Sequence, residues 1–248
     1  MNNRDKWRPS KFVFLKGKLI GSRDPAELAI SSRLMADLVA ARYAVLLKQH
    51  ATGNLLDLGC GKVPLLAVYE PLVQSVTCVD WANTLHPNEF IDMQCDLTQP
   101  LPFPNDRFDT IILSDVLEHV PTPNALWQEV ARVLAVGGKV LLNVPFFYWI
   151  HEAPHDYYRY TEFALRRFAD ETGLTVLSLE AIGGIPEVLC DLSAKTIERI
   201  PFIGPSFATF IQWSGRLFLK TSIGCRMSQN TRAAFPFGYF MVVEKHLQ

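Results

Sequence analysis

Residues 55–61 read Leu-Leu-Asp-Leu-Gly-Cys-Gly, and this stretch decides the fold. An apolar run typical of a buried strand leads into Asp57 and then into two glycines, Gly59 and Gly61. Glycine tolerates positive φ angles and lets the backbone approach a ligand closely. In open α/β sheets, nucleotides bind at such turns, where a parallel strand ends. The stretch therefore predicts an α/β fold with a nucleotide-type site at this turn.

The turn differs from the fingerprint of dinucleotide-binding proteins. Pro64 stands where that fingerprint has its third glycine. Asp57 precedes the first glycine by two positions, and a carboxylate there would repel a pyrophosphate. A ligand that carries an amine or a positive charge suits the turn better.

Polar residues also end the next three apolar runs along the chain. The first of these runs ends at Asp80, 19 positions after Gly61, close to where such folds place an acid on ribose hydroxyls. The second ends at Asp96 and the third at Ser114. We expect these side chains at one edge of the sheet, because parallel strands end on the same side.

Followed by Arg132-Val-Leu-Ala-Val-Gly-Gly-Lys-Val-Leu-Leu142, these strand ends resemble the class I S-adenosylmethionine-dependent methyltransferases, in particular bacterial type 11-like members. The resemblance covers roughly residues 50–184, a domain-sized stretch. It implies S-adenosyl-L-methionine as the cofactor. It also implies a Rossmann-like, doubly wound sheet of seven strands, the last antiparallel, with helices on both faces. The alternative is an α/β sheet whose acids only cap helices.

The resemblance also assigns cofactor roles to individual residues. Asp57 would lie near the methionine amino group, Asp80 would bind the ribose hydroxyls, and Asp96 would meet the adenine amino group. Trp81 would pack on adenine, with burial in the core as its alternative. The predicted cofactor-binding residues are Asp57, Gly59, Gly61, Asp80, Trp81, Asp96, Leu97 and Ser114.

A second cluster reads Asp115-Val-Leu-Glu118-His119. In one helical turn these three polar side chains would be neighbours. Some small-molecule O-methyltransferases and RNA-end methyltransferases carry Glu-x-x-Glu-His here and bind a divalent ion, but this chain has Asp first. We predict no metal, with Glu118 and His119 shaping the pocket. A metal held by Asp115, Glu118 and His119 is the alternative.

The third cluster lies in residues 145–161, where two histidines, two acids, an arginine and several aromatic residues follow a predicted strand. It resembles the His-Asp-Tyr/Phe-x-Arg-Tyr/Phe-Thr stretch of bacterial methyltransferases of glycan, lipid and secondary-metabolite pathways. Histidine readily accepts protons near neutral pH, so we predict His155, Asp156, His119 and Arg159 as catalytic. The alternative is that His155, Asp156 and Arg159 form a buried polar network that anchors the loop. The two interpretations are compatible.

Hydrophobic periodicity predicts alternating strands and helices around these motifs. Asp24, Pro25 and Glu27 predict a helix start, and Gly137-Gly138 and Gly173 predict helix ends. Residues 1–21 show no clear periodicity. The predicted strands are 54–59, 75–80, 90–95, 108–114, 138–144, 174–181 and 237–244, and the predicted helices are 24–50, 62–72, 123–135 and 161–172.

Residues 185–234 break this alternation with an aromatic-rich stretch, which predicts a helical insertion before the last strand. It would serve as a lid, a homodimer surface, a face resting on a membrane, or an enlarged core. The predicted parts are an N-terminal arm and helix (1–50), a cofactor-binding core (51–184), the insertion (185–234) and the last strand (235–248).

Composition narrows the partners and the compartment. The net charge of the 248 residues is −1, so a nucleic-acid partner is not favoured. Five cysteines without a Cys-x-x-Cys pair predict free thiols in a reducing compartment. No apolar run reaches the ~18 residues of a spanning helix. We expect the cytoplasm, with peripheral contact to the inner face of the membrane through residues 185–234.

These observations together predict a methyltransferase that uses S-adenosylmethionine. Its acceptor would be a small molecule, a glycan or a lipid-linked compound, methylated at oxygen. The alternatives are a non-catalytic binding subunit with the same fold, a metal-assisted O-methyltransferase, and another enzyme of this fold such as an aminopropyl transferase.

Overall fold

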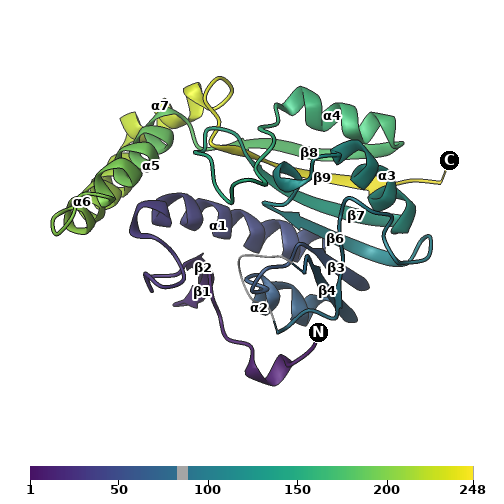
Figure 1. Ribbon diagram of the computed structural model, residues 1–248. Coiled ribbons are helices and arrows are strands. Elements are labelled where there is room, and N and C mark those ends of the chain that lie inside the picture. Colours follow the sequence, from purple (N-terminus) through teal and green to yellow (C-terminus); the bar gives the residue numbers. More distant parts are fainter. Residues whose placement is uncertain (83–88, 248) are drawn as a thin grey trace. The chain divides into compact units, whose positions relative to one another are not determined.

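The computed structural model describes residues 1–82 and 89–247, and within them lies a seven-stranded sheet surrounded by helices (Figure 1). The strands lie in the order β5-β4-β3-β6-β7-β9-β8, and β9, the last along the chain, is antiparallel. The predicted Rossmann-like fold class is therefore confirmed. The strands are β3 (Asn54–Leu58), β4 (Ser75–Asp80), β5 (Met93–Gln94), β6 (Phe108–Ser114), β7 (Leu134–Pro145), β8 (Leu174–Ile182) and β9 (Gly238–Lys245).

The central strands are apolar on both faces, as expected for parallel strands covered by helices. Leu55 and Leu56 of β3 and residues 111–113 of β6 are completely buried. Parallel pairing sets Asp57 opposite Cys78 of β4 and Ile112 of β6. The register brings the carboxyl ends of β3, β4 and β6 to one edge of the sheet, where the predicted cofactor residues gather.

The predicted strands are confirmed except for the start of β7 and the length of β5, which has two residues. The prediction that Gly137-Gly138 ends a helix is wrong, because both glycines lie within β7. The pairing of β6 with β7 jumps between Phe108–Leu134 and Thr110–Lys139, and Gly137 has a φ of +78° there. The glycines therefore allow a bulge in a strand.

Two of the three helices predicted within residues 51–184 form as predicted, and the third is shorter. Helix α3 (Pro123–Val133) and helix α4 (Glu162–Glu171) form as predicted. The Thr161 hydroxyl accepts a hydrogen bond from the backbone of Ala164, and Gly173 has a φ of +69° after α4. The segment predicted as a helix over 62–72 is shorter, with α2 (Leu66–Tyr69) and a 3₁₀ turn η3 (Glu70–Leu72).

The predicted start of the first long helix at Asp24 is wrong. Asp24 Oδ1 accepts a hydrogen bond from the backbone of Ala26, which closes a local turn instead. The helix proper consists of η2 (Ile30–Ser32) and α1 (Arg33–His50). The sequence pattern also misses a β-hairpin of β1 (Phe12–Leu15) and β2 (Lys18–Gly21), whose turn residues Lys16 and Gly17 both have positive φ angles.

The chain folds into two compact units. The first comprises residues 1–8, 46–180 and 239–248, and it holds most of the sheet and every predicted site residue. The second comprises residues 9–45 and 181–238, with the hairpin, most of α1 and the insertion. The predicted domain boundaries stay a prediction.

The predicted insertion is helical, with α5 (Ile185–Glu198), α6 (Gly204–Leu219) and α7 (Ser222–Thr231). Gln212 of α6 joins it to the beginning of α1: its Oε1 accepts from the Leu34 backbone at 2.7 Å, and its Nε2 donates to the Ser31 carbonyl at 2.6 Å. The Glu198 carboxylate accepts hydrogen bonds from the backbone of Ile30 and Ser31. None of the described helices is long and apolar enough to cross a membrane.

Candidate active site

The glycine turn after β3 is shaped by two residues in the left-handed region. Gly59 has a φ of +68° and Gly61 a φ of +51°. A Cβ on Gly59 would lie 2.6 Å from Cγ2 of Val116, so the missing side chain lets the turn pack against the segment after β6. A Cβ on Gly61 would meet no described atom within 4 Å. The turn therefore offers open space beside Gly61.

Asp80 at the end of β4 is fixed against this turn. One carboxylate oxygen accepts from the Gly61 backbone at 2.7 Å, and the other accepts from the Trp81 backbone at 2.7 Å. The residue is 8% exposed. An ordered, ionisable acid beside open space fits the hydroxyl groups of a ribose, because a carboxylate retains lone pairs for such donors.

Asp57 is the second acid at the turn, and it is almost completely buried. Its Oδ2 accepts a hydrogen bond from the Tyr69 hydroxyl at 2.8 Å. Burial, and more weakly the charge of Asp80, raise the pKa of Asp57 to about 7, although the Tyr69 hydrogen bond acts in the opposite direction. A cation near this carboxylate would favour its ionised form, which fits a ligand that carries an amino group.

The remaining predicted cofactor residues lie near the carboxyl ends of β4, β5 and β6. Trp81 is half-buried after β4, and Ser114 pairs with Asn143 at the end of β6. Asp96 is exposed, and its Oδ1 accepts from both the backbone and the hydroxyl of Thr98. Leu97 is half-buried beside it. The contacts of these residues with a cofactor stay predictions.

The segment between β7 and α4 is tied to the segment after β6. The Tyr157 backbone donates to the Glu118 carbonyl at 2.9 Å. The hydroxyls of Tyr158 and Tyr160 donate to the carbonyls of Pro121 and Leu117 at 2.9 and 3.0 Å. The second and third predicted clusters therefore lie together, although the joined residues are about 40 positions apart along the chain.

Asp156 and Arg159 form the polar anchor of this loop. The guanidinium of Arg159 donates to both carboxylate oxygens of Asp156, at 2.5 and 2.8 Å, and also to the Trp149 carbonyl at 2.9 Å. Burial opposes ionisation of Asp156, but the hydrogen bonds from Arg159 and from the His151 backbone outweigh it and lower its pKa to about 2. The ion pair agrees with the interpretation that Asp156 and Arg159 anchor the loop. A catalytic role for these two residues stays a prediction.

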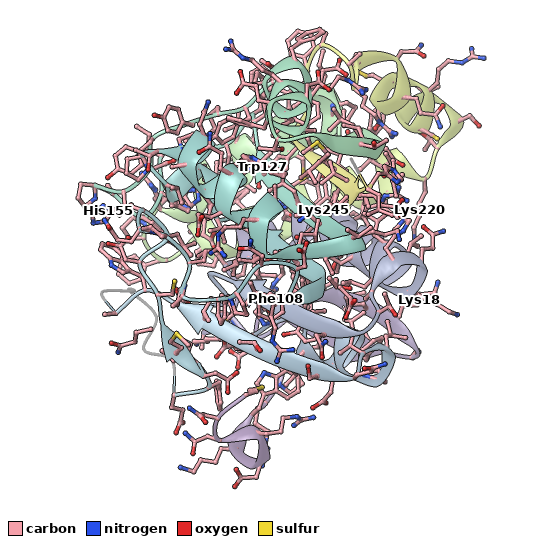
Figure 2. The ribbon with its side chains drawn as sticks, turned by 90° about the vertical axis from the view of Figure 1, so that its right-hand side faces the viewer. Lys18, Phe108, Trp127, His155, Lys220 and Lys245 are labelled. Atoms are coloured by element: carbon pink, nitrogen blue, oxygen red, sulfur yellow. The ribbon has the colours of Figure 1, made fainter. Side chains whose placement is uncertain are left out.

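His155 lies at the outer edge of this loop (Figure 2). Its ring contacts Trp81 edge to face at a centroid distance of 4.9 Å, and its Nδ1 is 3.2 Å from the Tyr157 hydroxyl. Its carbonyl oxygen is 2.6 Å from Nδ1 of His119. His155 therefore connects the residue after Asp80 to the cluster after β6, but no contact joins its ring to Asp156 or Arg159.

A compact group consists of Glu118, His119 and His151. The predicted site residues include His119 and, in the metal alternative, Glu118, but not His151. The ligand atoms of the three residues in the group all lie within 4.8 Å of one another. Oε1 of Glu118 is 3.8 Å from Nε2 of His119 and 4.0 Å from Nε2 of His151. Glu118 is completely buried, and neither of its carboxylate oxygens has a hydrogen bond to a described residue.

Asp115 lies outside this group, although one interpretation of the sequence placed it there. It has a φ of +54°, and its carboxylate accepts a hydrogen bond from the Asn143 side chain. The residues after it form a 3₁₀ turn η4 (Leu117–His119) and not an α-helix. His151 takes its place, and the only sequence signal for it was a second histidine in the loop after β7.

Comparison with known proteins agrees with this geometry. Residues 30–179, more than half of the chain, match a family described as a methyltransferase domain. The chain therefore belongs to this family of class I S-adenosylmethionine-dependent methyltransferases, and both the predicted membership and the family's cofactor are confirmed.

Two curated relatives carry the name ubiquinone biosynthesis O-methyltransferase. The protein of Xanthomonas oryzae pv. oryzae (strain PXO99A) is 30% identical over 117 residues, which cover 43% of this chain and 47% of that protein. The protein of Idiomarina loihiensis is 30% identical over 111 residues, which cover 39% and 46%. The chain thus spans about half the length of the curated relatives it matches.

Two solved structures share the fold at low sequence identity. Phosphoethanolamine N-methyltransferase 2 of Haemonchus contortus, in complex with S-adenosyl-L-methionine, has a TM-score of 0.55 at 14% identity and covers 91% of this chain and 59% of that one. The [4+2]-cyclase SpnF has a TM-score of 0.54 at 18% identity and covers 86% and 83%. The fold alone therefore does not define the reaction, because one fold serves different chemistries.

Proposed function

We propose that this protein transfers the methyl group of S-adenosylmethionine to an oxygen atom of a small-molecule, glycan or lipid-linked acceptor. The observation that carries the proposal is the contact of His155 with Trp81. It places a histidine from the loop after β7 beside the residue that follows Asp80. In this proposal His155 would act as the base, next to the cofactor turn at one edge of the sheet.

The residues of the turn would bind and orient the cofactor, which when bound supplies an electrophilic methyl group. Asp80 would accept hydrogen bonds from ribose hydroxyls, and Asp57 would pair with the amino group. The open space at Gly61 would let the backbone approach the ligand closely. Transfer then requires an acceptor oxygen held in line with the methyl group.

His155 would remove the proton of an acceptor hydroxyl, because its ring contacts Trp81 beside the cofactor turn. Asp156 and Arg159 would act as positioning residues through their ion pair, which holds the loop that carries His155. His119 would hold the same loop through its hydrogen bond to the His155 carbonyl. The names of the curated relatives support oxygen as the acceptor atom, although they align with half of this chain.

The test of the base compares His155→Ala with His246→Ala, a matched control on an exposed histidine after β9. We expect His155→Ala to lower the rate of methyl transfer by ~100-fold or more. Calorimetry should show that its affinity for S-adenosylmethionine is retained, and the control should keep both properties. A near-normal rate for His155→Ala would remove the base from the proposal.

We also propose that the insertion rests on a lipid surface, which would hold the protein on the membrane that carries a lipid-linked acceptor. The buried face of α6 consists of Gly204, Ala208 and Gln212. The opposite face is exposed and apolar, which reverses the usual pattern of a surface helix. Its exposed residues are Ile203, Phe207, Phe210, Trp213 and Leu217.

The charges around this apolar face select an anionic membrane as its partner. Every charged residue from Arg199 to Phe237 is basic: Arg199, Arg216, Lys220, Arg226 and Arg232. Arg216 pairs with Asp37, whereas Lys220, Arg226 and Arg232 are exposed. Aromatic residues flanked by cations are typical of helices that lie in the interface of anionic bilayers.

A further inference from the structure

We propose that Glu118, His119 and His151 form a binding site for a divalent transition-metal ion. The site lies where η4 meets the loop after β7, and each residue offers one ligand atom. The carboxylate of Glu118 is completely buried without a hydrogen bond to a described residue. A buried carboxylate normally has a partner, and an ion bound between the three side chains would supply it.

A hydrogen bond orients the ring of His119 as it does in known metal sites. Nδ1 of His119 is 2.6 Å from the carbonyl oxygen of His155, and a carbonyl can only accept, so Nδ1 carries the proton. The lone pair of the neutral ring is therefore on Nε2, the atom that faces Glu118. An Nδ1–H that donates to a carbonyl is the usual outer contact of a metal-bound histidine.

His151 lies beside a carboxylate, although its Nδ1 makes no hydrogen bond to a described residue. Its Nδ1 is 3.2 Å from Oδ2 of Asp156, and its Nε2 faces Glu118. Asp156 stays ionised because Arg159 holds both of its oxygens. The negative charge of Asp156 favours a proton on Nδ1 and leaves the lone pair on Nε2.

The distances require only a small adjustment. Four ligands at about 2.1 Å from an ion in a tetrahedron lie about 3.4 Å from one another. The carboxylate oxygen is 3.8 and 4.0 Å from the two imidazole nitrogens, and the three atoms lie within 4.8 Å. The side chains would have to close by about 1 Å, which rotations about side-chain torsions can provide.

The ligand set defines the class of ion. Two imidazoles and one carboxylate suit zinc, iron, cobalt or manganese, whereas calcium and magnesium prefer oxygen ligands. The imidazoles are 15% and 20% exposed, so an ion is reachable from outside and keeps a position for water or for an acceptor oxygen. The binding itself does not rest on the proposed function. The role of the ion does, since it would polarise an acceptor hydroxyl.

The test measures binding of Co²⁺ alone to the full chain after treatment with a chelator. We expect about one Co²⁺ per chain, visible as d–d absorption and displaced by Zn²⁺. Glu118→Gln and His151→Ala should each weaken binding by more than about 100-fold, and Asp156→Asn by about 10–100-fold. His246→Ala, a histidine outside the group, should bind like the wild type.

A second measurement, on the wild-type chain, tests the proposal even if the substituted chains do not fold. Zn²⁺ should raise the melting temperature of the wild-type chain in a concentration-dependent way, because it binds only the native arrangement. The proposal is overturned if the wild type binds no Co²⁺ at micromolar concentration and Zn²⁺ does not shift its melting temperature. Equal binding by wild type, Glu118→Gln and His151→Ala would also overturn it.

Discussion

Asp57 is the residue whose ionisation state should control cofactor binding. Its pKa of about 7 lies above the unfolded value of 3.8, because burial favours the neutral acid. Its contribution to the stability of the ligand-free protein is therefore complete below the unfolded value. It is lost as the pH rises through about 7.

The same shift predicts pH-dependent affinity for S-adenosylmethionine. Below pH 7 Asp57 must lose its proton to the solvent before its carboxylate can pair with the ammonium group of the ligand, which costs up to ~10-fold in affinity per pH unit. Calorimetry between pH 5.5 and 8 should show the affinity rising and levelling off above about 7. Asp57→Asn, which can still accept from Tyr69, should bind more weakly with a flatter profile. Parallel profiles for the two proteins would contradict this assignment.

The two glycines of the turn should respond differently to the same substitution. Gly59→Ala places a Cβ 2.6 Å from the Val116 side chain at a positive φ, so it should cost about 2–4 kcal/mol of stability. Gly61→Ala has open space, so its cost should be about 1–2 kcal/mol, from the left-handed backbone alone. We expect Gly61→Ala to lose most of its cofactor affinity while its melting temperature changes less. Retention of full affinity would show that the backbone at Gly61 does not approach the ligand.

The sequence predicted the site best where the backbone alone fixes a residue. A local pattern is enough to bring these residues together. Asp57, Gly59 and Gly61 lie on β3 and the turn that follows it, and Asp80 ends the neighbouring strand β4. The position of His151 could not be predicted this way. It lies next to Glu118 because three hydrogen bonds, from Tyr157, Tyr158 and Tyr160, hold the loop after β7 against the segment after β6. Asp115 departs from its predicted position because its backbone is left-handed.

At the scale of elements, periodicity predicted the parallel strands well, since their apolar runs are continuous. Periodicity failed where a glycine or proline is compatible with two different local structures. Gly137-Gly138 reads as a helix end but forms a bulge in β7. Asp24-Pro25 reads as a helix start but closes a turn before η2. The bulge depends on pairing with β6, which is distant in the sequence, whereas the turn is closed by the side chain of Asp24 itself.

The reversed polarity of α6 makes a prediction about membranes. The full chain should float with vesicles that contain anionic lipid and release them as salt increases, because both apolar contact and cations contribute. Phe207→Ser combined with Phe210→Ser should abolish flotation. The matched control is Phe163→Ser, which removes an exposed aromatic side chain from α4 in the other unit.

Two results would contradict the membrane assignment of α6. One is a wild-type chain that never floats with anionic vesicles. The other is a dimer in analytical ultracentrifugation that the double substitution dissociates, because the apolar face would then be a contact between two copies.

At the scale of the whole molecule, the sheet assembles one site from segments distant in sequence. β3 and β4 supply the acids of the turn, β6 leads into Glu118 and His119, and β7 leads into the loop of His151 and His155. The insertion belongs to a separate compact unit with the hairpin and most of α1. The cofactor turn and the exposed apolar face of α6 can therefore be tested by independent substitutions.

Methyl transfer itself is tested most directly by incubating the full chain with cell extract and S-adenosylmethionine that carries a tritiated methyl group. We expect label in a product that mass analysis shows to carry a new O-methyl group, together with release of the demethylated cofactor. Asp80→Ala should lower the labelling by about 5–150-fold at limiting cofactor, since the ribose hydroxyls lose their buried acceptor at a cost of ~1–3 kcal/mol. A chain that binds S-adenosylmethionine but labels nothing in the water-soluble or lipid fractions would contradict the account.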